Sequence, residues 1–76
     1  MFIQTIDDDL VDTKFITCVS DENNYIICKL LSKDSYQLYY SENIDYSMKE
    51  KLSRLISMKK LTTDVYNQEQ LIKDMK

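Results

Sequence analysis

Glycine, proline, histidine and tryptophan are all absent from this chain of 76 residues. Without glycine there is no glycine-rich loop to hold phosphates, which excludes a P-loop or a dinucleotide-binding fold. Without glycine and proline, the turns must rely on Asn, Asp and Ser, which also tolerate turn geometry. Without histidine, the chain lacks both the most common general base and the most common metal ligand.

The same absences argue against catalysis. No Ser–His–Asp or Cys–His arrangement is possible, and a cysteine nucleophile would lack its usual base. A domain of this length buries only about 60% of its unfolded surface, so little chain is left to build a deep cleft. We therefore expect one small domain over residues 1–76 that is not an enzyme and has no catalytic residues, metal site or cofactor.

The two cysteines, Cys18 and Cys28, do not have a zinc or redox spacing. We expect both to be small buried groups with free thiols in a reducing compartment. No signal-peptide pattern is visible, and no apolar run approaches the ~18 residues of a membrane span. The expectation is a soluble, cytoplasmic protein with no membrane contact, in the host cytoplasm if a phage encodes it.

The net charge of −3 hides an asymmetry between the two halves of the chain. Residues 1–45 contain nine acidic and three basic side chains, whereas residues 46–76 contain four acidic and seven basic ones. Asymmetry of this kind indicates the character of binding partners more than it indicates a fold.

Residues 14–41 are rich in aromatic and β-branched side chains and are interrupted twice by short polar runs. Three apolar runs, at 14–20, 25–31 and 36–41, predict the strands of an antiparallel meander. A four-residue loop over 21–24 and a turn over 32–35 connect them.

Two strand registers follow from these loops. Ser20 is expected opposite Tyr25, which places the two cysteines on opposite faces of the sheet. Leu31 is expected opposite Tyr36, which places Tyr36, Leu38 and Tyr40 together on one face. One face can be covered by a helix, and the other would then remain partly exposed with tyrosines on it.

The remaining segments predict a short first strand over residues 2–6 at a sheet edge, and two helices. Ser47 and Glu50 form a capping-box pattern before a helix that ends near Lys60, with Asp45 as an alternative N-cap. Residues 61–66 fit a strand, a loop or a helix start, and a short final helix follows Asn67. The expected fold is α+β, a three- to four-stranded antiparallel meander packed against one main amphipathic helix, with a short C-terminal helix.

The densest group of charges precedes the meander and contains Asp7, Asp8, Asp9 and Asp12. A hard cation would need about six or more converging oxygens, and the chain has no glycine-containing calcium loop. Two interpretations remain, a solvated turn and a contact surface for a basic partner.

Six tyrosines make the chain rich in a residue that is favoured at protein interfaces. Tyr36, Tyr39 and Tyr40, beside Glu42 and Asp45, form the best candidate patch, although aromatic residues are also ordinary strand formers. Direct binding of nucleic acid is not expected, because base stacking on such a platform also needs a basic groove. The candidate partner-binding residues are Asp7, Asp8, Asp9, Asp12, Asp21, Glu22, Tyr36, Tyr39, Tyr40, Glu42 and Asp45.

The order of a Tyr-rich meander, the capped helical segment YYSENIDYSMKEKLSRLIS and the terminal segment NQEQLIKDMK resembles the small phage-encoded anti-CRISPR inhibitors of Cas nucleases. The resemblance lies in size, composition and element order, and that class has no shared signature from which binding residues can be transferred. Some of its members have acidic surfaces that imitate nucleic acid, which implies an inhibitor that docks on a basic nucleic-acid-binding site.

A physical argument leads to the same function independently of the resemblance, because clustered carboxylates on a rigid domain can occupy a site built for phosphates. Other functions fit the sequence as well. One is a small structural or regulatory subunit that homodimerises or completes a partner through its Tyr-rich sheet face. The others are an antitoxin-like neutraliser of a basic enzyme and an accessory subunit of an enzyme.

Overall fold

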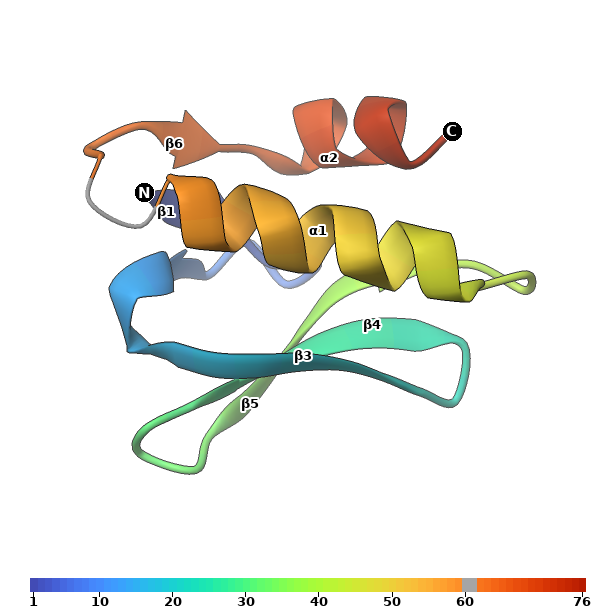
Figure 1. Ribbon diagram of the computed structural model, residues 1–76, viewed down its shortest axis with the longest axis horizontal. Coiled ribbons are helices and arrows are strands. Elements are labelled where there is room, and N and C mark those ends of the chain that lie inside the picture. Colours follow the sequence, from blue (N-terminus) through green and yellow to red (C-terminus); the bar gives the residue numbers. More distant parts are fainter. Residues whose placement is uncertain (60–61) are drawn as a thin grey trace.

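The computed structural model describes residues 1–59 and 62–76 and has the α+β fold that the sequence predicts (Figure 1). Two helices combine with two three-stranded sheets, one of order β3-β4-β5 and one of order β2-β1-β6. In chain order, the elements are β1 (Phe2–Gln4), β2 (Leu10–Asp12), η1 (Thr13–Phe15), β3 (Ile16–Glu22), β4 (Tyr25–Leu30), β5 (Ser35–Tyr40), α1 (Tyr46–Met58), β6 (Val65–Tyr66) and α2 (Gln68–Met75).

The predicted meander is present as β3, β4 and β5, but its registers differ from those expected. Glu22 lies opposite Tyr25, so the β3–β4 loop contains only Asn23 and Asn24 rather than four residues. Both asparagines have positive φ, of 52° and 69°. Two such residues form the tight primed turn whose twist matches that of a hairpin, and Asn supplies it in a chain without glycine.

The second register is wrong by three residues, because Tyr36 lies opposite Cys28 rather than Leu31. A bulge between Ile26 and Ile27 then shifts the remaining pairs, so that Tyr40 lies opposite Tyr25. The odd shift places Tyr36 on the face of Cys28. The bulge breaks the alternation between Gln37 and Tyr39, so Tyr40 lies on the opposite face from Tyr36, and Leu38 is fully buried.

The cysteines do lie on opposite faces, because the shift in the first hairpin is an even one. Both thiols are free, and Cys28 is buried as expected, but Cys18 is exposed. Burial raises the pKa of Cys28 to about 11. Cys28 is therefore an inert part of the core at neutral pH.

The second sheet is not visible in the sequence pattern. Its central strand is β1, which corrects the expectation of an edge strand: Ile3 pairs antiparallel with Val11 and parallel with Tyr66. Within residues 61–66, for which the sequence allowed a strand, a loop or a helix start, Val65–Tyr66 thus form a strand. Lys60, where the main helix was expected to end, and Leu61 lie outside the described residues.

Helix α1 begins after Asp45, not at the capping box expected from Ser47 and Glu50. The Asp45 carboxylate accepts hydrogen bonds from the Met48 amide at 2.9 Å and from the Ser47 hydroxyl at 2.7 Å. Asp45 therefore occupies the N-cap, and Ser47 lies inside the helix and supports it. The second helix starts after Asn67, whose side chain accepts from the Gln70 amide as the sequence indicated. Within the described residues, neither helix is long and apolar enough to cross a membrane.

We expect Asp45→Ala to lower the urea midpoint at neutral pH. Hydrogen bonds from the Met48 amide, and secondly from Ser47, hold the pKa of Asp45 below its usual range. A depressed pKa means that the stabilisation is present above the unfolded-state pKa of about 3.9 and is lost as the pH falls through the folded-state value. The deficit of the variant should therefore shrink below about pH 4.

Urea titrations at neutral pH and at about pH 2 measure this difference directly. Glu42→Ala removes an exposed carboxylate from the loop before the helix and is the matched control. An Asp45→Ala deficit that is equally large at both pH values would contradict the assignment of a charged cap.

One core joins all the layers of the molecule. Helix α1, helix α2 and the β2-β1-β6 sheet lie on the same side of the β3-β4-β5 meander (Figure 1). The buried cluster takes residues from each of them: Met1, Ile3, Val11, Ile16, Ile26, Cys28, Leu38, Leu52, Ile56, Tyr66, Leu71 and Met75. The opposite face of the meander is left for contact with solvent or a partner.

Candidate functional site: an acidic groove beside the meander

A groove of about 460 Å³ lies against β4 and β5 and brings together residues from distant parts of the chain. Ile27, on its floor, is on the opposite face of β4 from Ile26 and Cys28, which belong to the core. The groove is lined by Asp7, Asp9, Glu22, Asn23, Tyr25, Ile27, Ser35, Tyr36 and Gln37. Three carboxylates and two tyrosines therefore surround one concave surface.

Asp7 and Asp9 are positioned by the turn between β1 and β2. The Thr5 amide donates to the Asp9 carbonyl at 2.8 Å, and the Asp9 amide donates back to the Thr5 hydroxyl at 3.1 Å. Asp8 between them adopts a positive φ of 66°, which Asp tolerates better than most residues. The Ile6 amide donates to the Gln37 carbonyl at 3.0 Å, which holds this turn against β5.

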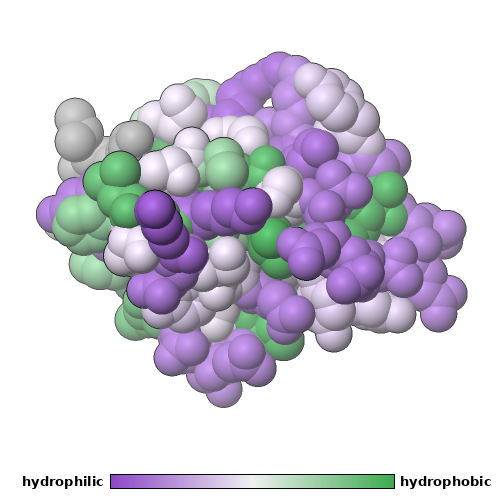
Figure 2. Space-filling view, turned by 90° about the horizontal axis from the view of Figure 1, so that it is seen from below, coloured by the Kyte–Doolittle hydropathy of each residue, from purple (hydrophilic) through white to green (hydrophobic). Residues whose placement is uncertain are grey.

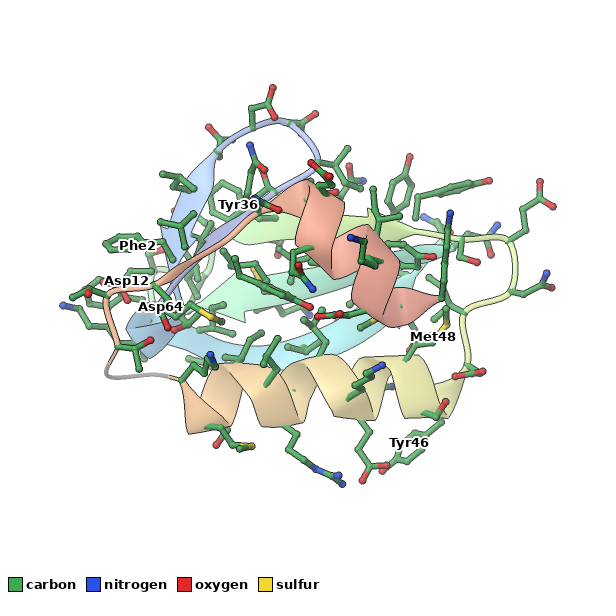
Figure 3. All side chains as sticks on the ribbon, turned by 90° about the horizontal axis from the view of Figure 1, so that it is seen from above. Phe2, Asp12, Tyr36, Tyr46, Met48 and Asp64 are labelled. Carbon is green, nitrogen blue, oxygen red and sulfur yellow. The ribbon has the colours of Figure 1, made fainter. Side chains whose placement is uncertain are left out.

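Glu22 reaches the same groove from the other side, because it is the last residue of β3 before the tight Asn23–Asn24 turn. Tyr25 begins β4 directly after that turn, and its ring lies 5.0 Å from the ring of Tyr40. Tyr36 lines the groove from the start of β5, on the side of the molecule where β1 and its following turn lie (Figure 3). The groove thus lies between the β1–β2 turn, which supplies Asp7 and Asp9, and the β3–β4 turn beside Glu22, with residues of β4 and β5 between them.

The carboxylates of the groove differ from Asp12 and Asp21, each of which lies beside a lysine ammonium. Within residues 1–59 and 62–76, the structure has no ion pair to Asp7, Asp9 or Glu22. Three like charges around one groove, without a cation of their own, create a negative potential that attracts Lys or Arg. Figure 2 shows the molecule from below as mainly hydrophilic, with hydrophobic residues in separate small groups.

The remaining candidate acids serve mainly local structure. Asp12 caps η1 and lies 3.5 Å from the Lys14 ammonium, and Asp45 caps α1. Asp21 lies 3.0 Å from the Lys49 ammonium, and this hydrogen bond and charge hold the pKa of Asp21 below its usual range. Asp8 accepts from Gln4, and Glu42 is exposed in the loop before α1.

The predicted tyrosine patch is divided by the observed register. Tyr39 is half-buried against the core, Tyr36 lines the groove, and Tyr40 is 49% exposed beside Tyr25. Sequence reasoning therefore identified four groove residues, Asp7, Asp9, Glu22 and Tyr36. It did not identify Asn23, Tyr25, Ile27, Ser35 or Gln37 as site residues, and the only signal was the position of Asn23 and Tyr25 next to Glu22.

The side chains around the groove are chemically suited to contact Lys and Arg side chains of another protein. No group of three His, Cys, Asp or Glu side chains among the described residues is arranged to hold a metal ion. Hydroxyl, amide and aromatic groups lie beside the carboxylates, and this combination suits the side chains of Arg and Lys, which pair with carboxylates and stack on aromatic rings. Comparisons of this chain with protein families, curated proteins and solved structures find no match.

Proposed function

We propose that this chain is a non-enzymatic, acidic protein-binding module that docks on a basic nucleic-acid-binding site of a partner. A Cas nuclease complex is an example of such a partner, and the proposed action is that of an anti-CRISPR-like inhibitor and nucleic-acid mimic. The observation that carries the proposal is the convergence of Asp7, Asp9 and Glu22 on one groove, with no ion pair to them within residues 1–59 and 62–76.

The groove supports a protein partner rather than a nucleic acid, because phosphates would be repelled by its three carboxylates. A nucleic-acid-binding enzyme presents Lys and Arg on a surface shaped for closely spaced negative charges. Two rigid turns hold the carboxylates in place before binding, so little conformational entropy would be lost on docking.

The alternative of a homodimer or subunit that uses the Tyr-rich sheet face has weaker support. Tyr36 and Tyr39 already contact the protein's own core or groove, and Leu38 between them is fully buried. The exposed part of this face is therefore smaller than the sequence suggested.

The experiment uses the immobilised chain to capture proteins from a nuclease-treated bacterial lysate. We expect the captured partner to be a nucleic-acid-binding protein that is released as the salt concentration rises and is displaced by added DNA or RNA. The triple variant Asp7→Asn, Asp9→Asn, Glu22→Gln should retain about tenfold less of it, a change of about 1.4 kcal/mol.

A matched control neutralises three carboxylates away from the groove, with Glu50→Gln, Asp64→Asn and Glu69→Gln. Both triple variants change the net charge equally, from −3 to 0. Equal loss of capture in the two variants, or capture that is insensitive to salt, would show that the groove is not the docking site. Gel filtration of the purified chain reports self-association, which would favour the homodimer instead.

A further inference from the structure

The outer edge of β3 is not paired with another strand. The order of its sheet is β3-β4-β5, so β3 has a neighbour on one side only, among the residues that the structure describes. The other edge, at β5, is partly covered, because the Ile6 amide and the Gln68 side chain donate to the carbonyls of Gln37 and Leu38. The meander therefore has one open edge.

The hydrogen-bond pattern shows which groups of β3 face outward. The Leu31 amide donates to the Phe15 carbonyl, and the Leu30 amide donates to the Asp34 carbonyl, so odd-numbered residues of β4 bond toward β3. Their partners in the register are Cys18, Ser20 and Glu22. In an antiparallel pair, alternate residues point their backbone groups away from the partner strand, and here these include Val19 and Asp21.

A pocket of about 240 Å³ lies along this edge, between β3 and helix α1. Cys18 and Val19 line it from the strand, and Ser53, Ile56 and Ser57 line it from the helix. The two serines are four residues apart, so they lie on the same side of α1 and leave room beside the edge. Tyr46, at the start of the helix, is exposed and points away from the sheets (Figure 3).

We infer that the groove between the β3 edge and α1 binds an extended segment of a protein partner as an additional strand. The outward backbone groups of β3 select an extended chain, because their spacing matches another strand. Alternate side chains of the segment would enter the pocket beside Ser53 and Ser57, which selects small or medium apolar residues there.

A second copy of this chain does not fit the same place. Symmetric antiparallel pairing of two β3 edges keeps the same faces of both sheets on one side. Helix α1 packs over β3 and its edge (Figures 1 and 3), so two copies of the helix would compete for the same space. The occupant is therefore a segment that has no helix above it.

The test uses a phage-displayed library of random ten-residue peptides, selected on the immobilised chain. Enriched peptides are synthesised and added to the isotope-labelled protein, and NMR measures amide shifts and hydrogen exchange. We expect the largest shifts at residues 17–21 and 53–57. The Val19 amide, which faces outward in the free protein, should become protected when the peptide is bound.

Two matched variants, each with a tryptophan in place of an exposed α1 residue, show whether the selected peptides bind in the pocket beside α1. Ser57→Trp fills the pocket and should weaken binding at least tenfold, whereas Arg54→Trp, on another side of the helix, should leave it within about twofold. Circular dichroism and the urea midpoint verify that both variants fold. Selection of no peptide, equal binding to the two variants, or shifts confined to other residues would overturn the inference.

The double variant Asp7→Asn, Asp9→Asn separates this site from the acidic groove. It should bind the selected peptides as well as the unchanged protein does, because neither aspartate lines the pocket beside α1. Loss of peptide binding in this variant would assign the peptides to the acidic groove and would also overturn the inference.

Discussion

Leu38→Ala should lower the free energy of unfolding by about 2–5 kcal/mol, the usual range for emptying a leucine site in a core. Leu38 is fully buried and lies at the bulge of β5, in contact with the core that joins the meander to both helices. The expected loss is a large fraction of a total stability that is about 5–15 kcal/mol for natural domains. Urea denaturation monitored by circular dichroism measures it.

Leu31→Ala is the matched control, because it removes the same atoms from a side chain that is 71% exposed. Its midpoint should remain close to that of the unchanged protein, since surface substitutions usually change stability by less than 0.5 kcal/mol. If Leu38→Ala were as mild as Leu31→Ala, the observed register of β5 would be incorrect. The sequence alone placed Leu38 with Tyr36 and Tyr40, where its truncation would have changed association rather than folding.

Gln68→Ala should cost about 2–3 kcal/mol, because it leaves backbone acceptors in a partly buried position without their donor. The side-chain amide of Gln68 donates to the carbonyl of Gln4 at 2.8 Å and to the carbonyl of Leu38 at 2.7 Å. The Gln68 backbone amide in turn donates to the side-chain carbonyl oxygen of Gln4 at 2.8 Å. One residue at the start of α2 thus connects β1 of the small sheet with β5 of the meander.

Gln70→Ala provides the comparison within the same helix. Gln70 is exposed, and its side-chain amide donates to the Asp74 carboxylate at 3.0 Å. We expect a smaller change in the urea midpoint than for Gln68→Ala. Equal effects would indicate that loss of helix propensity or local contacts dominates, and that the link between the two sheets contributes little.

If both proposed surfaces function, the chain has two different means of recognition. The acidic groove would attract a basic surface through charge, which favours rapid and salt-sensitive association. The β3 edge would recognise an extended backbone through hydrogen bonds, which depend less on salt. The two surfaces are formed by different parts of the meander, so the variants described above can separate their contributions.

The sequence by itself determined the elements that depend on neighbours in the chain. The helical stripe of α1, the Asn67 cap of α2, and the three strands of the meander all follow from residues within a few positions of one another. The choice between Asp45 and Ser47 as the first cap was left open, because both residues have suitable side chains and only the path of the incoming chain distinguishes them.

Only the tertiary structure decided the features that require distant segments to meet. The pairing of Phe2 with Val65, the bulge beside Ile27, and the convergence of Asp7 and Glu22 on one groove depend on packing across the whole chain. Short strands with several apolar residues on both faces allow more than one register by pattern alone. The common core selects among them, because it buries Ile3, Leu38 and Leu71 at the same time.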